Sequence, residues 1–244
     1  MRQLPLGVRL RDAAAFASYH GGPNEAALDY VRTLAAGRAT AGAWLWGRPG
    51  VGKTHLLQAA CRAADGAGRA AIYLPLESLA RHGAAPLQGL GGQALVAIDE
   101  LDAAAGSAGL ERGLFALYNE LQDAGGQLLI ASAANPAALP VILPDLRSRL
   151  AACVVYPLRQ LDEDETAAAL RLRATHRGLE MSEDTARYLM RRLPRDIASL
   201  CRWLDRLDDA SLAAQRRLTV PFVSRVLGEE TVAGAGPPAP RDGD

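Results

Sequence analysis

The motif G-x-x-x-x-G-K-T at residues 47–54 constrains this chain more than any other feature of its sequence. It follows the short apolar run 43–46 and precedes apolar residues at helical spacing. A glycine-rich turn between a strand and a helix points backbone N–H groups at phosphate oxygens, and the helix dipole strengthens that attraction. We therefore predict a phosphate-binding loop, rather than a purely structural turn, in which Lys53 reaches the β- and γ-phosphates and Thr54 binds Mg²⁺. The residues expected to hold the phosphates are Gly47, Gly50, Gly52, Lys53 and Thr54.

Arginine dominates the basic residues of the chain. Of the 27 basic side chains, 26 are arginine and the single lysine is Lys53. Placed at random among the basic positions, that lysine would fall in the motif about once in 27. Its position supports the interpretation of residues 47–54 as a functional loop.

Strand-like and helix-like segments alternate around this motif. Further apolar runs of strand length lie at 70–74, 94–98, 128–132 and 152–156. Helical patterns lie at 24–36, 76–82 and 109–124. The apolar runs are nearly continuous, as in strands that are buried on both faces of a parallel sheet. The pattern predicts an α/β fold with a five-stranded, doubly wound parallel sheet.

After Pro157 the pattern becomes helical only. Helix starts are expected at Asp162, at Ser182 and at Thr219, with a further apolar helix face over 197–204. The predicted organisation is an arm at 1–12, an α/β nucleotide-binding domain at 13–157, a small helical domain at 158–227 and a disordered tail at 228–244.

Charge and composition argue against several classes of protein, namely membrane, secreted, zinc-binding and duplex-DNA-binding proteins. The chain has no run of 18 apolar residues and no basic-then-apolar leader, so we expect a cytoplasmic protein that does not bind a membrane. Its three cysteines lie far apart, which predicts reduced thiols and no zinc site. Formal net charge is zero, and residues 159–227 hold 13 arginines against 11 acidic residues. That balance predicts no strong direct binding to duplex DNA.

Three further residues, Asp99, Glu100 and Arg149, point to phosphate chemistry. The apolar run 94–98 ends in Asp99 and Glu100, where Asp99 would hold Mg²⁺ and Glu100 would orient and deprotonate an attacking water. A solvated loop is the alternative, because aspartate often ends strands. Arg149, between the fourth and fifth predicted strands, could reach the nucleotide of a neighbouring protomer or could be an ordinary surface arginine.

Together these features resemble the AAA+ family, and within it the Hda branch of DnaA-homologous regulators, over residues 3–227. The stretches that carry the resemblance are 16–19, 22–24, 44–47, 55–57, 118–119, 143–150, 204–208 and above all 210–223. The resemblance implies a P-loop AAA+ domain followed by a helical lid. An initiator would carry a further helix-turn-helix domain, which does not follow residue 227 here.

The resemblance also implies a function, the negative regulation of DNA replication initiation. The sequence Q-L-P-L-G, with Gln3, Leu4 and Leu6, is similar to the peptide with which such regulators dock on the β subunit of the DNA polymerase sliding clamp. Without the resemblance, the alternative to a clamp-binding peptide is an N-terminal arm whose leucines only cover the hydrophobic core. Arg149 becomes an arginine finger that promotes hydrolysis of ATP bound to DnaA. The implied cofactors are ADP or ATP with Mg²⁺, with His55 beside the phosphate loop, and homo-oligomer formation is left open.

The sequence departs from the family at the two sensor positions. The first falls near Ala133, which cannot orient water, and leaves Ser132 and Asn135 as candidate substitutes. The second falls at Ala198, and Arg195, about one turn earlier, is the candidate there. We therefore expect strong phosphate binding but weak turnover by this chain alone. The alternative function is a helicase-loading ATPase of the DnaC or IstB type, and clamp binding separates the two.

Overall fold

The chain folds into two compact units that divide between Asp162 and Glu163. The computed structural model describes residues 14–194, 196–214 and 217–233. The division falls later than the predicted boundary at 157/158, because Leu158 belongs to the core of the first unit. Its backbone N–H donates to the Trp46 carbonyl at 2.7 Å, which ties this residue to the first strand.

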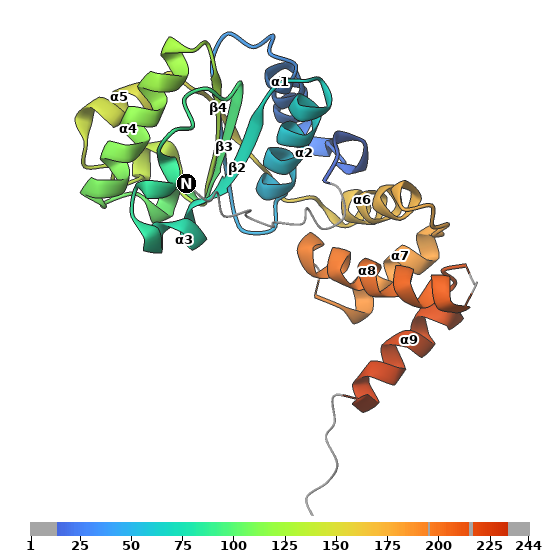
Figure 1. Ribbon diagram of the computed structural model, residues 1–244. Helices are drawn as coiled ribbons and strands as arrows, with labels where there is room; N and C mark the ends of the chain where they lie inside the picture. Colours follow the sequence, from blue (N-terminus) through green and yellow to red (C-terminus); the bar gives the residue numbers. More distant parts are fainter. Residues whose placement is uncertain (1–13, 195, 215–216, 234–244) are drawn as a thin grey trace, which may run out of the picture. The chain divides into compact units, whose positions relative to one another are not determined.

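Among the described residues, five parallel strands form one sheet in the order β2-β3-β4-β1-β5 (Figure 1). The strands are β1 (Ala43–Trp46), β2 (Ala71–Pro75), β3 (Leu95–Asp99), β4 (Gln127–Ser132) and β5 (Val154–Pro157). Each overlaps a predicted apolar run. The order places β1 between β4 and β5, so the loop that leaves β1 lies away from the sheet edges. The predicted α/β fold with a five-stranded parallel sheet is confirmed.

Helices cover both faces of the sheet (Figure 1). One face carries α1 (Glu25–Ala35) and α2 (Lys53–Gly66); the other carries α3 (Leu76–Leu79), α4 (Ala108–Asp123) and α5 (Pro144–Leu150). Short 3₁₀ helices lie at Phe16–Ser18, Gly22–Asn24, Ala80–His82, Ala85–Leu87, Leu101–Ala103 and Pro136–Ala138. In β3, Leu95 and Ala97 pack in the core under α1 and α2, whereas Val96 and Ile98 pack in the core under α4. This alternation explains why the strand sequences are continuously apolar.

Asn24 shows how the ends of the α/β unit are joined. It precedes α1 as the sequence predicts, but its side chain makes no capping hydrogen bond. Instead, Nδ2 donates to the Arg159 carbonyl at 2.9 Å and Oδ1 accepts from the Arg159 N–H at 2.8 Å. Asn24 is 3% exposed. The residue therefore ties the segment before α1 to the segment after β5.

The second unit is helical. Its helices are α6 (Glu163–His176), α7 (Glu183–Arg192), α8 (Ile197–Ala214) and α9 (Val220–Ala233). Ser182 Oγ accepts from the Thr185 N–H at 3.2 Å, which is the cap expected at that serine. Their apolar faces meet in a separate core that includes Leu170, Leu189 and Leu204.

The last helix runs further than its apolar pattern indicated. The sequence predicted an end at Leu227, but α9 continues to Ala233. A glycine inside a helix costs only about 1 kcal/mol relative to alanine, so Gly228 does not stop it. The predicted arm at 1–12 and the rest of the tail lie outside the described residues.

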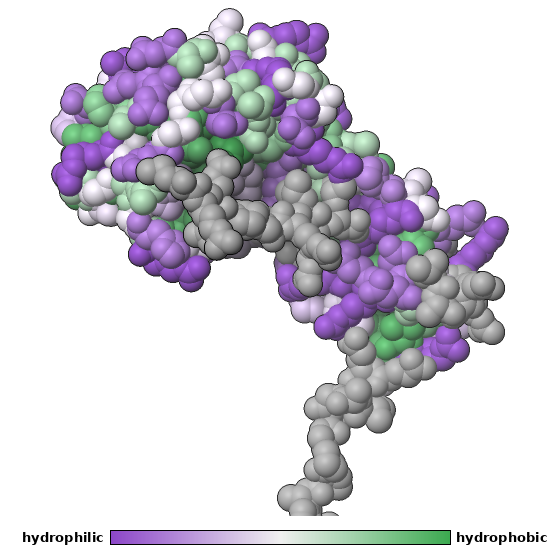
Figure 2. Space-filling view, in the orientation of Figure 1, coloured by the Kyte–Doolittle hydropathy of each residue, from purple (hydrophilic) through white to green (hydrophobic). Residues whose placement is uncertain are grey.

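Hydrophilic residues cover most of the face of the molecule seen in Figure 2, and its hydrophobic areas are small and scattered. Within the described ranges, no helix is both long enough and apolar enough to cross a membrane. Among the residues that the structure describes, the exposed large apolar side chains are those of Ile142, Val154 and Val155.

Candidate functional site

The loop between β1 and α2 adopts a backbone that requires glycine. Gly47, Gly50 and Gly52 all have positive φ, at 155°, 83° and 96°. A Cβ on Gly52 would lie 2.8 Å from a ring carbon of Tyr19, and one on Gly47 would lie 2.7 Å from the Leu158 carbonyl oxygen. The motif glycines are therefore needed both for the turn and for the close approach of neighbouring groups.

Lys53 begins α2 and folds back over this loop. Its Nζ donates to the Gly47 carbonyl at 2.5 Å and to the Arg48 carbonyl at 3.1 Å. Burial lowers the pKa of the Lys53 ammonium, and the nearby carboxylates of Asp99, Asp102 and Glu100 partly offset that effect. The loop thus holds a half-buried ammonium at the start of a helix, where phosphate oxygens are favoured.

The structure brings Thr54 and Asp99, the two residues expected to hold Mg²⁺, into contact. Thr54 Oγ1 donates to Asp99 Oδ2 at 2.7 Å, and the Tyr73 hydroxyl donates to the same oxygen at 2.9 Å. The Glu100 N–H donates to the other carboxylate oxygen at 3.0 Å, and Asp99 is only 1% exposed. A hydroxyl beside a fixed carboxylate is a pair of oxygen ligands that suits Mg²⁺ when phosphate and water complete the shell.

Tyr73 is a site residue that the sequence analysis missed. It lies in β2, opposite Ala97 in the parallel register with β3, and Ala97 precedes Asp99 by two residues. Side chains two apart on a strand share a face, so the register could have placed the hydroxyl near Asp99. The strand pairing itself had no signal in the sequence.

Glu100, which follows Asp99 in the sequence, has an unusual backbone conformation. Its φ of 57° is the only positive value at a non-glycine position in the described part of the chain. Such strain at a non-glycine residue is a feature of functional sites. Burial, Asp99 and Glu77 raise the pKa of the Glu100 carboxyl above its ordinary value. A raised pKa improves a carboxylate as a general base.

No group of three or more histidine, cysteine or acidic side chains forms a metal site in the residues that the structure describes. The Thr54–Asp99 pair supplies two oxygen ligands. Mg²⁺ is commonly bound by one or two protein oxygens together with nucleotide phosphates and water.

Ser132, one candidate sensor, is fully buried at the end of β4. Its hydroxyl accepts from Trp44 Nε1 at 2.7 Å and donates to the Ala134 carbonyl at 2.7 Å. Both bonds are internal to the domain, so this hydroxyl joins β4 to β1.

The segment after β4 is held by an acidic residue that the sequence analysis did not single out. The Asp102 carboxylate accepts from the N–H groups of Ala133 at 2.7 Å and Ala134 at 3.0 Å. Asn135 is exposed, and its Oδ1 accepts from the Ala137 N–H at 2.9 Å. Asp102 thus connects the segment after β3 with residues 133–134, which follow β4. Arg195, the other candidate, lies outside the described residues.

His55 contacts the residues that precede α1. Its Nε2 lies 3.0 Å from the Ala15 carbonyl oxygen, and its ring centroid lies 5.5 Å from that of Tyr19. Gln3, Leu4 and Leu6 lie outside the described residues.

Arg149 is exposed on α5, between the buried side chains of Leu146 and Leu150. Its guanidinium carbon lies 5.9 Å from the centroid of the Tyr118 ring on α4, within the range of a cation–π contact. The helix that carries Arg149, α5, covers the opposite face of the sheet from α2, the helix that starts at the phosphate loop (Figure 1).

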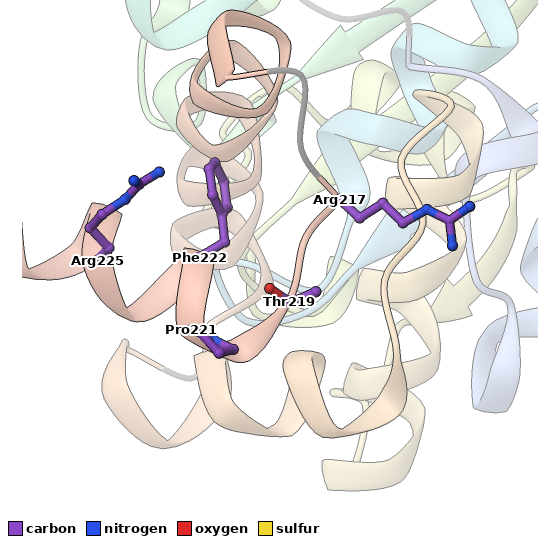
Figure 3. Close-up of a pocket in the computed structure, with 5 residues that line it drawn as sticks. All are labelled: Arg217, Thr219, Pro221, Phe222 and Arg225. Carbon is purple, nitrogen blue, oxygen red and sulfur yellow. The ribbon is translucent and has the colours of Figure 1, made fainter.

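A pocket of about 290 Å³ lies in the helical unit at the start of α9 (Figure 3). Its lining residues are Arg217, Thr219, Pro221, Phe222 and Arg225. Arg225 lies over the Phe222 ring, whereas Arg217 points away from the other labelled side chains and pairs with Glu180 at 3.1 Å. None of the residues predicted for the phosphate, clamp or finger roles lines this pocket.

Comparison with known families agrees with this arrangement. Residues 43–158 match the model of the ATPase family associated with various cellular activities (AAA), and residues 162–227 match the lid domain of Hda. The P-loop α/β domain and the helical lid together define an AAA+ protein. The match of the lid goes further, because it distinguishes one branch. The chain belongs to the Hda-like, DnaA-homologous branch of the AAA+ family.

Individual proteins resemble this chain along most of its length. An uncharacterized protein of Haemophilus influenzae is 39% identical over 227 residues, covering 93% of this chain and 98% of its own length. Domain III of the replication initiation protein DnaA from Thermotoga maritima has a TM-score of 0.71 at 21% identity, over 89% of this chain and 97% of its own. AMPPCP-bound DnaA from Aquifex aeolicus has a TM-score of 0.71 at 19% identity, over 92% of this chain and 71% of its own length. The two solved structures show a shared fold.

Proposed function

We propose that this chain is a nucleotide-binding regulator that limits replication initiation in the cytoplasm by promoting hydrolysis of ATP on DnaA. The observation that carries the proposal is the match of residues 162–227 to the Hda lid. In the sequence this region follows an α/β domain, and the chain shares the fold of DnaA domain III. In this proposal the chain docks on the sliding clamp and supplies an arginine in trans.

The chain's own nucleotide, ADP or ATP, would be held by the phosphate loop. The N–H groups around Gly50 and Gly52 and the Lys53 ammonium would bind the phosphates, and Thr54 and Asp99 would hold Mg²⁺. This assignment is supported by the backbone of the loop and by the 2.7 Å bond between Thr54 and Asp99. Glu100 would serve as base for any hydrolysis by the chain itself. An alanine at position 133 offers no side chain to orient water, so we expect that turnover to be slow.

Arg149 would act on a nucleotide bound to DnaA. Negative charge develops on the phosphate oxygens as the terminal phosphoryl group is transferred, and a guanidinium placed there stabilises the transition state. The proposal is supported by the exposure of Arg149 and by its place on α5. An arginine finger that acts on a nucleotide bound to another chain must project from the surface of the chain that carries it.

The peptide Gln3 to Leu6 would join the chain to the clamp. Two leucines can anchor an extended peptide in an apolar groove while the glutamine amide forms hydrogen bonds at its end. Docking on a clamp that encircles DNA would bring this protein and DnaA together without direct DNA binding.

The test is the hydrolysis of ATP preloaded on DnaA, in the presence of clamp loaded on DNA. Wild type, Arg149→Ala and the triple variant Gln3→Ala, Leu4→Ala, Leu6→Ala are compared, with Arg112→Ala as a control that removes an exposed arginine on α4. We expect stimulation by wild type and the control. Arg149→Ala should bind clamp and nucleotide normally yet lose stimulation at least about tenfold, since fingers contribute about 10³–10⁵ to kcat. The triple variant should lose clamp binding.

Full stimulation by Arg149→Ala would remove Arg149 as the finger. Clamp binding by the triple variant at wild-type affinity would remove the peptide as the docking site. If wild type itself fails to bind the clamp with nucleotide present, the assignment moves to the helicase-loading class.

A further inference from the structure

Glu111, in the first turn of α4, is a charged residue buried without any role in the site described above. It is 1% exposed. Its Oε1 accepts from the N–H groups of Gly106 at 2.8 Å and Ile142 at 3.0 Å, and its Oε2 accepts from Ile142 at 2.9 Å and Leu143 at 2.7 Å. Burial alone would raise the pKa of this carboxyl, but the backbone N–H bonds and Arg147 outweigh burial and hold it below its ordinary value.

These bonds fix the segment that leads into α5. Residues 141–143 are outside any helix or strand. The Val141 N–H donates to the Leu139 carbonyl at 2.8 Å, and the Leu143 carbonyl accepts from the Arg147 N–H at 3.1 Å, but the N–H groups of Ile142 and Leu143 bond to a side chain. Glu111 satisfies the N–H groups of Ile142 and Leu143, and the Arg147 guanidinium donates to the Val141 carbonyl. The segment is therefore bound from both sides, by α4 and by α5 itself.

The direction of α5 depends on this segment. With 7 residues, α5 is too short to be stable on its own. It is held by the packing of Leu146 and Leu150 in the core and by the connection that enters it. Arg149 is carried on the exposed side of this helix, so a shift in the entering segment would move its guanidinium.

We propose that Glu111 is a positioning residue for Arg149: its buried carboxylate fixes residues 141–143 and thereby the direction in which α5 presents the guanidinium to a nucleotide on another chain. This inference rests on the proposed role of Arg149. Displacement of a catalytic group by about 1 Å can cost about a hundredfold in rate. Glu111 itself touches no reacting atom.

The first measurement needs no variant. Hydrogen exchange of single amides in the wild-type chain compares Ile142 and Leu143, bonded to the buried carboxylate, with Ala137, bonded to the exposed Asn135. We expect exchange at least about tenfold slower at Ile142 and Leu143. Equal rates at the three amides would overturn the proposed restraint.

The second measurement uses Glu111→Gln, which keeps the shape of the side chain but turns one acceptor into a donor that faces N–H groups. Glu120→Gln, an exposed carboxylate on the same helix, is the matched control. In the DnaA hydrolysis assay we expect the maximal stimulated rate of Glu111→Gln to fall about tenfold or more. The concentration for half-maximal stimulation and the chain's own nucleotide affinity should change less than about twofold. In an Arg149→Ala background the substitution should have no further effect.

The outcomes separate this inference from the proposed function. Full stimulation by Glu111→Gln, beside an inactive Arg149→Ala, would overturn the positioning role alone. Retained stimulation by Arg149→Ala would overturn the proposed finger and with it the role of Glu111. A parallel loss of nucleotide affinity and stimulation would show that Glu111 serves only the fold.

Discussion

At the scale of single residues, Lys53 is the side chain that we propose contributes most to nucleotide binding. It is the only ammonium among 27 basic side chains, and in the structure it bonds to two carbonyls of its own loop. Those carbonyls orient Nζ over the loop, where phosphate oxygens are expected. The neighbouring carboxylates keep the local charge from becoming strongly positive.

Lys53→Ala should lower the affinity for ADP at least about a hundredfold, because hydrogen bonds to charged groups contribute about 1.5–3 kcal/mol each. A titration with a fluorescent nucleotide measures the effect. Lys53→Arg keeps the charge but replaces a compact ammonium with a planar fork, so it separates charge from geometry. Unchanged affinity in Lys53→Ala would remove the loop from the nucleotide site.

At the scale of elements, the joint between α1 and the end of β5 depends on one buried amide. Asn24→Asp should lower the free energy of unfolding by about 1–3 kcal/mol, because the Arg159 carbonyl loses its donor in a buried position. Urea denaturation followed by circular dichroism measures this. Asn135→Asp is the matched control, since its exposed Oδ1 acceptor is retained. Equal stabilities of the two variants would contradict the role of Asn24.

The elements themselves could be predicted because their signals are local. Continuous apolar runs located the strands, and the spacing of G-x-x-x-x-G-K-T located the loop. The Arg159 partner of Asn24, the Ala133 partner of Asp102 and the Ile142 partner of Glu111 could not be predicted, because each of these bonds spans 31 or more residues of sequence. An asparagine before a helix suggests a cap, and nothing nearby in the sequence indicates that Arg159 will be its partner. The hydrogen-bond partners of these polar side chains are set by the tertiary fold and not by the local sequence preference for caps and turns.

At the scale of the whole molecule, the charge balance argues against direct action on DNA. Formal net charge is zero, and residues 159–227 hold only two more arginines than acidic residues, 13 against 11. Binding to duplex DNA should therefore be weaker than about 10 µM at physiological salt. Fluorescence anisotropy of a labelled duplex at low and moderate salt measures it, with an initiator that carries its DNA-binding domain as positive control. Tight binding with a steep salt dependence would contradict the proposed reliance on the clamp.

The bonds of Lys53 to the carbonyls of Gly47 and Arg48 have a consequence for covalent labelling. Apart from the α-amine, the chain offers acylating reagents a single primary amine, and that amine lies in the phosphate loop. A reagent specific for amines therefore acts as a probe of one site without any engineering. Protection of Lys53 from acylation would report the bound nucleotide directly, even in a mixture with the clamp and DnaA.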